Sequence, residues 1–359
     1  MIDLTTLILG FISAIGFASI FAVDPISIKS TQVPGFFESQ GYTGDTVGKM
    51  FRERLRHIGD VVGTIRGDEF SHDYVHQTAI DEFAKELQLD TLVDASRDFL
   101  GLRLYAISGL VTYTGNTYKY TLKVQTPDEQ TFFVTVQDEG DIPGLINDMA
   151  ESFLARTDPY ILAQYYRRVE APSGQFTKTI PMLEHCIRVL PSNQTMWPIL
   201  VRGSVHLRLG EYDQAIQRYQ QVTELDPSYA EAYALWGKAL IGKGESEAGL
   251  AMMRKAVELA PNDPYQKKAK KWASVYAHLG DELVKRGQDE EAREIYIQGI
   301  EMMPVNPWPK AGLGKLYLRH KQYDPAIDLL RAAMHNHPEK EKVREQLDLA
   351  LAGKFGLAL

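Results

Sequence analysis

Residues 313–338 read LGKLYLRHKQYDPAIDLLRAAMHNHP and describe one complete helical hairpin. Gly314 and Ala326 place a small residue on each of two consecutive segments of helical length, so two antiparallel helices can pack closely there. Pro338 cannot continue a helix and therefore marks the end of the second one. Such a hairpin leaves an apolar face bare, which a stacked neighbour has to cover.

The same punctuation recurs with a period of 34 residues. Four pairs of positions have this separation: Gly203 and Gly237, Pro227 and Pro261, Gly280 and Gly314, and Pro304 and Pro338. A 34-residue period with glycine and proline at fixed places resembles the tetratricopeptide repeat (TPR) family. The resemblance implies an α-solenoid of stacked hairpins from about residue 160 to residue 340.

Individual units follow the order of residues found in the family. Three units besides the one at Gly314 do so: Leu279, Gly280, Leu283, Ala292, Tyr296 and Pro304; Trp236, Gly237, Leu240, Gly249, Met253, Ala256 and Pro261; and Gly203, His206, Ala215, Tyr219 and Pro227. A degenerate unit with Ala163, Tyr166, Phe176, Leu183 and Pro191 precedes them. Residues 341–352 fit a closing helix, with Val343, Leu347 and Leu351 turned inward.

In this family the first helix of each hairpin lines the inner face of the array and binds extended or helical peptides. Carried over to this sequence, the groove positions are Trp197, Leu200, Ser204, Arg208, Glu231, Lys238, Asp281, Lys285, Trp308, Lys315 and Arg319. The Lys and Asn clamp by which some members bind chaperone C-termini is missing, because Leu200, Ala234, Ala277 and Ala311 occupy its first key position. An apolar floor with a basic rim favours an acidic partner with apolar anchors.

The period breaks once, because Pro261 and Pro304 are 43 residues apart. The additional residues contain a basic patch flanked by aromatic residues: Lys267, Lys268, Lys270 and Lys271. This patch could bind an acidic peptide or anionic headgroups. The alternative is a solvated face that keeps the array soluble.

The N-terminus contains twenty consecutive uncharged residues, 4–23. As a helix this run would be roughly 30 Å long, the thickness of a bilayer's hydrocarbon core. No basic residue precedes it, so we expect an uncleaved transmembrane anchor rather than a signal peptide. The basic residues that follow favour, slightly, a cytoplasmic soluble part. We expect a single-pass protein of a bacterial inner membrane.

Residues 25–158 mix helix and strand patterns. Val47, Phe51, Leu55 and Ile58 have helical spacing, and a last helix is expected over residues 142–153. Three alternating runs, 104–113, 118–124 and 132–136, predict a three-stranded meander. This order resembles the TolB-type amino-terminal domain, which implies a non-catalytic α+β adaptor.

Composition narrows the class of protein. The apolar fraction of 44% and the charged fraction of 24% are those of a globular protein, and one cysteine, Cys186, excludes a disulfide framework. Residues 1–158 contain 12 Lys and Arg against 23 Asp and Glu, a net charge of −11, and residues 159–359 contain 27 against 24, a net charge of +3. An acidic first half argues against nucleic-acid binding.

The usual catalytic motifs do not occur in a suitable context. Residues 237–243 read as the start of a P-loop, but Gly244 stands where a magnesium-binding Ser or Thr is needed. Asp68, Glu69, His72 and His76 have a spacing that could bind a divalent ion, with a solvated loop as the favoured alternative. We therefore expect neither catalysis nor a metal nor a cofactor.

The sequence thus predicts a mainly α protein: residues 1–24 an anchor, 25–158 an α+β domain, and 159–359 a TPR array with a capping helix. Its predicted function is a membrane-anchored scaffold that recruits a protein or peptide partner through the TPR groove. One alternative is an exported periplasmic TPR protein in envelope assembly. Another is a metal-dependent enzyme built on the middle domain.

Overall fold

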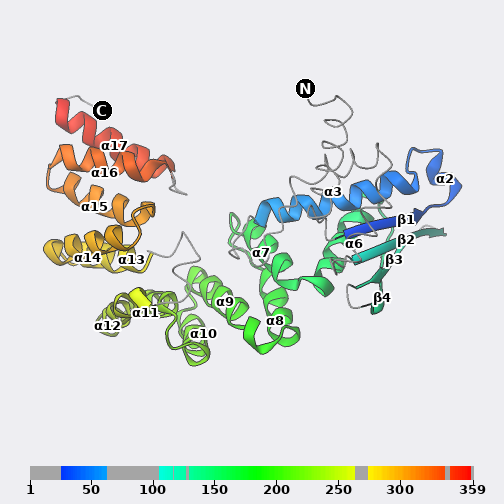
Figure 1. Cartoon of the computed structure of the whole chain (residues 1–359), viewed down its shortest axis with the longest axis horizontal. Coiled ribbons are helices and arrows are strands. Elements are labelled where there is room, and N and C mark those ends of the chain that lie inside the picture. Colours follow the sequence, from blue (N-terminus) through cyan, green and yellow to red (C-terminus); the bar gives the residue numbers. More distant parts are fainter. Residues whose placement is uncertain are drawn as a thin grey trace, which may run out of the picture. The chain divides into compact units, whose positions relative to one another are not determined.

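The computed structural model describes residues 26–62, 105–115, 117–126, 129–262, 274–335 and 340–356. The chain divides into two compact units, residues 1–182 and 183–359. Each unit has its own hydrophobic core. Figure 1 shows the helices and strands of both units.

The N-terminal unit contains one four-stranded sheet in the order β1-β2-β3-β4. The strands are β1 (Ile26–Gln32), β2 (Tyr105–Thr114), β3 (Thr117–Gln125) and β4 (Thr131–Asp138). β2, β3 and β4 form the predicted antiparallel meander, whereas β1 adds a parallel edge strand next to β2. Gly109 allows β1 close to the sheet, since a Cβ there would lie 3.0 Å from Thr31 Oγ1.

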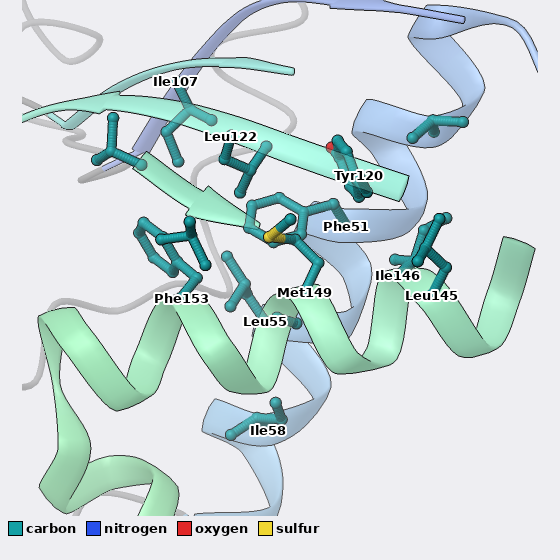
Figure 2. Close-up of a cluster of buried hydrophobic side chains, with 14 of the residues drawn as sticks. Phe51, Leu55, Ile58, Ile107, Tyr120, Leu122, Leu145, Ile146, Met149 and Phe153 are labelled. Carbon is teal, nitrogen blue, oxygen red and sulfur yellow. The ribbon is translucent and has the colours of Figure 1, made fainter. Parts of the chain in front are cut away.

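Helices cover one face of this sheet. They are α3 (Gly44–Val62) and α6 (Ile142–Thr157); the unit also contains α2 (Gly35–Glu38) and α7 (Pro159–Glu170). Strand residues alternate between buried and exposed positions, and Figure 2 shows the buried set meeting α3 and α6. Phe51 and Phe153 pack edge to face at 5.7 Å in this core. The predicted helical spacing in residues 47–58 is therefore the core-facing stripe of α3.

The compact N-terminal unit extends beyond residue 158, because α7 packs against α3 and α6. Tyr166 donates a hydrogen bond of 2.6 Å to Glu151 on α6, and Arg54 on α3 donates one of 2.9 Å to the hydroxyl of Tyr165. Leu162 is fully buried in the same core. The first helix of the degenerate unit thus joins the α+β layer, and the predicted TolB resemblance stays a prediction.

Paired helices make up the C-terminal unit. Its helices are α9 (Met196–Leu209), α10 (Tyr212–Leu225), α11 (Ala230–Lys243), α12 (Ser246–Leu259), α13 (Ser274–Lys285), α14 (Asp289–Met302), α15 (Pro307–Arg319), α16 (Tyr323–Met334) and α17 (Lys340–Phe355). α8 (Thr179–Val189) crosses the unit boundary, and short 3₁₀ turns lie at Ser192–Gln194 and Ala260–Asn262. α17 covers α16 with Val343 and Leu347, as a closing helix should.

One prediction from the sequence requires correction. Among the helices of the described residues, none is long and apolar enough to cross a bilayer. The localisation as a single-pass membrane protein is therefore not supported. The segment on which that prediction rested, residues 4–23, lies outside the described residues.

A carboxylate closes the turn between α7 and α8. Glu170 accepts hydrogen bonds from the backbone N–H of Lys178 and Thr179, at 2.8 and 3.0 Å, and from the hydroxyls of Thr177 and Thr179, at 2.9 and 2.7 Å. Burial acts to raise the pKa of the Glu170 carboxyl, but these hydrogen bonds outweigh it and hold the pKa below its ordinary value. Glu170 thus satisfies N–H groups that α8 leaves unpaired at its start.

Glu170→Gln should lower the free energy of unfolding at neutral pH by about 1 kcal/mol, the size of a lost helix cap. Because the folded pKa lies below the unfolded one, the wild-type advantage is complete above about pH 4.3 and disappears as the pH falls through the folded pKa. Urea unfolding across this pH range measures the difference. Glu139→Gln, at an exposed position of the same unit, is the control. A deficit that does not change with pH would contradict the capping role.

Candidate partner-binding surface

The first helices of the hairpins, α9, α11, α13 and α15, pack in sequence along the C-terminal unit. Figure 1 shows α12 and α14 on the outer side of α11 and α13. Repeat glycines bring each pair together: a Cβ at Gly280 would lie 2.5 Å from Tyr296, and one at Gly237 would lie 2.6 Å from the carbonyl oxygen of Gly249. Any side chain at these glycines would separate the pair, so the spacing read from the sequence is a packing requirement.

Two tyrosines of the second helices reach through to the first helices. The Tyr296 hydroxyl donates a hydrogen bond of 2.6 Å to Asp281 Oδ1, and the Tyr219 hydroxyl lies 3.4 Å from Ser204 Oγ. Burial, followed by the charge and hydrogen bond of Asp281, raises the pKa of Tyr296. Asp281 and Ser204 each directly follow a repeat glycine, so the core fixes two of the predicted groove residues from behind.

The positions expected to form an apolar floor are buried. Leu200 is 8% exposed, and Ala234, Ala277 and Ala311 are at most 4% exposed. They belong to the core of the array and offer little area to a partner. Trp197 and Trp308, on the first and last of these helices, are half-buried. The Trp197 ring also packs edge to face on Tyr229 at 5.7 Å.

Several predicted rim charges have partners within the protein. Lys285 pairs with Glu282 at 3.2 Å. Arg319 reaches the previous hairpin, where it donates hydrogen bonds to the carbonyl of Val284 at 3.0 Å and to Asp289 at 3.3 Å. Arg208 is exposed and Glu231 is half-buried. Arg319 therefore ties adjacent repeats together at the end of the helix.

Lys238 and Lys315 differ from these residues. Both are exposed, and no carboxylate among the described residues forms an ion pair with either. Both directly follow a repeat glycine, like Ser204 and Asp281. Sequence reasoning assigned these lysines to the rim through the family's groove positions, but only the structure distinguishes them from the internally paired Lys285 and Arg319.

The sequence prediction did not include His278, on α13. Its imidazole is half-buried, and burial together with the positive charges of Lys238 and Lys285 lowers its pKa to about 3. Burial is the larger cause of this shift, and the two lysines add to it. His278 and Lys238 belong to different hairpins, and no pattern in the sequence predicts that the lysine acts on the histidine.

The remaining predicted sites lie outside the described residues. These are the basic patch at Lys267, Lys268, Lys270 and Lys271, and the possible metal cluster at Asp68, Glu69, His72 and His76. In the part of the chain that the structure describes, no group of three or more acidic, histidine or cysteine side chains is placed to hold a metal ion.

Comparison with family models identifies the repeats. A model described as TPR repeat matches residues 203–244, and one described as tetratricopeptide repeat matches residues 230–263 and 273–306. The chain therefore contains tetratricopeptide repeats, which confirms the recognition made from the 34-residue period. The C-terminal unit is the TPR solenoid of a mainly helical protein whose N-terminal part contains a small sheet.

Similar known proteins share this repeat. The small glutamine-rich tetratricopeptide repeat-containing protein 2 of Mycosarcoma maydis is 30% identical over 67 residues, which are 19% of this chain and 19% of that protein. The chain thus matches about a fifth of that relative's length. A thermophilic TPR protein of Thermus thermophilus is 18% identical, with a TM-score of 0.41 over 53% of this chain and 98% of that one. YrrB, described as a TPR protein with an unusual peptide-binding site, is 18% identical, with a TM-score of 0.32 over 48% and 84%.

The two tyrosine contacts provide a matched test. Tyr296→Phe should lower the free energy of unfolding by about 1–2 kcal/mol, because a short hydrogen bond to a carboxylate is lost. Tyr219→Phe should cost less, about 0.5 kcal/mol, because its contact with the neutral Ser204 is long. Denaturant unfolding of the full chain measures both. Because both variants keep the ring, equal losses would show that the hydrogen bond to Asp281 contributes no more than the long contact with Ser204.

Proposed function

We propose that this protein is a non-catalytic interaction scaffold whose TPR array binds a protein or peptide partner along α9, α11, α13 and α15. The observation that carries the proposal is the pair of exposed lysines, Lys238 and Lys315, that have no ion-pair partner among the described residues. Lys243, Arg286 and Arg319, near the ends of other helices, are by contrast paired internally. Unpaired charges at equivalent repeat positions are available for a partner.

The chemistry of the surface favours an acidic partner. Lys238 is exposed and has no ion-pair partner among the described residues, so an incoming carboxylate would meet a positive charge there. Trp197 on α9 and Trp308 on α15 are half-buried, and these two helices are the first and last of the four first helices. A segment with apolar anchors at its ends and acidic residues between them would use both features. Of the groove residues inferred from the family, we propose the exposed and half-buried ones as the binding surface, with Lys238 and Lys315 as the principal contacts.

Binding to a peptide library tests the proposal. A display library of randomised 12-residue peptides, selected on the full chain, should enrich acidic peptides with aromatic or aliphatic residues. The affinity of selected peptides should fall as salt rises, because exposed charges are screened. Failure to enrich any peptide, or enrichment of basic ones, would contradict the proposal.

Charge reversal locates the site. Lys238→Glu with Lys315→Glu should weaken the selected acidic peptides about tenfold or more, since attraction becomes repulsion at two positions. Lys321→Glu with Arg331→Glu makes the same change in net charge at exposed positions of the turn before α16 and of α16 itself, and should leave the affinity unchanged. Fluorescence anisotropy with labelled peptides measures both. Equal effects of the two double variants would indicate non-specific attraction rather than a groove.

A further inference from the structure

The residue that directly follows the repeat glycine alternates in charge along three consecutive first helices. Lys238 follows Gly237 on α11, Asp281 follows Gly280 on α13, and Lys315 follows Gly314 on α15. All three side chains are exposed. Because α13 packs against both α11 and α15, the three charges form a row across neighbouring helices in the order positive, negative, positive.

We infer from this row that the bound segment has the complementary order, with a Lys or Arg flanked on both sides by Asp or Glu. This inference rests on the proposed function, and it specifies what the groove selects. None of the three row charges forms an ion pair within the described residues. A purely acidic ligand would place a carboxylate against Asp281, whereas a ligand with a central cation satisfies all three positions.

The requirements of the fold do not explain the charge of Asp281. The buried Tyr296 hydroxyl needs an acceptor, and Asp281 Oδ1 provides it. In the equivalent place two hairpins earlier, the neutral hydroxyl of Ser204 lies nearest to that of Tyr219. A tyrosine at this place therefore requires no negative charge. The second carboxylate oxygen of Asp281 stays available on the exposed face.

Helix spacing sets the spacing of the ligand's charges. Packed helices lie about 8–10 Å apart, and an extended chain advances about 3.3 Å per residue. Neighbouring positions of the row are therefore about three residues apart along an extended peptide. The expected pattern is an acidic residue, a basic residue about three positions later, and a second acidic residue about three positions after that.

The test uses peptides selected on the wild-type full chain and compares variants of their central residue. Replacing the central Lys or Arg by Glu should weaken binding to the wild type about tenfold. Asp281→Lys should reverse this preference, and Asp281→Asn should remove it. Tyr296→Phe, which keeps the charge but loses the hydrogen bond, should retain the preference. Asp328→Lys, an equal change in charge at an exposed position of α16, should also retain it.

The outcomes separate this inference from the proposed function. If Lys238→Glu with Lys315→Glu weakens binding but Asp281→Lys leaves the preference at the central position unchanged, the charge order is wrong and the scaffold function stands. If selection on the wild type enriches only uniformly acidic peptides, the inference is likewise overturned. If no peptide binds, both proposals fail. Enrichment of the predicted order, reversed by Asp281→Lys, supports both.

Discussion

The architecture of the C-terminal unit depends on how closely the two helices of each hairpin approach. Gly203, Gly280 and Gly314 each face a large side chain of the second helix at a distance where a Cβ would overlap it. In the hairpin α11–α12 both helices contribute a glycine, Gly237 and Gly249, so the backbones themselves meet. Interiors packed at this density cannot accept an added methyl group without displacement, so the repeat's spacing follows from packing.

This close approach connects the core to the proposed partner-binding surface. Where the second helix contributes a tyrosine, its hydroxyl comes within reach of the residue after the repeat glycine, and that residue has to be an acceptor. Tyr219 and Tyr296 accordingly face Ser204 and Asp281. In the other two hairpins the second-helix position is Met253 or Leu330, which demands no acceptor, and a lysine stands in front of it.

How well each part of the structure could be predicted from the sequence depends on how far apart in the sequence its interacting residues lie. The hairpins and the meander could be predicted because their signals are local: a glycine, an alanine and a proline at fixed separations, or alternation within one strand. The parallel pairing of β1 with β2 joins residues about 80 positions apart, and no local pattern in the sequence predicts it. The core position of α7 rests on contacts such as Arg54 with Tyr165, 111 residues apart, which no periodic pattern encodes.

The candidate site shows the same division in more detail. The family's groove positions lie on the first helices of the hairpins. They could not separate the internally paired Arg319 from Lys315, because that distinction depends on where Asp289 of the preceding hairpin lies. The paired residues gather at the ends of the helices, next to the turns of adjacent repeats. The residue after the repeat glycine lies farther from those turns. Its nearest neighbours are on the adjacent first helices. A charged residue at that position can therefore remain without an ion-pair partner in the fold. Where no tyrosine hydroxyl needs an acceptor, the fold is compatible with a charge of either sign. Sequence variation at this position can therefore change the charge of the proposed partner-binding surface without changing the solenoid.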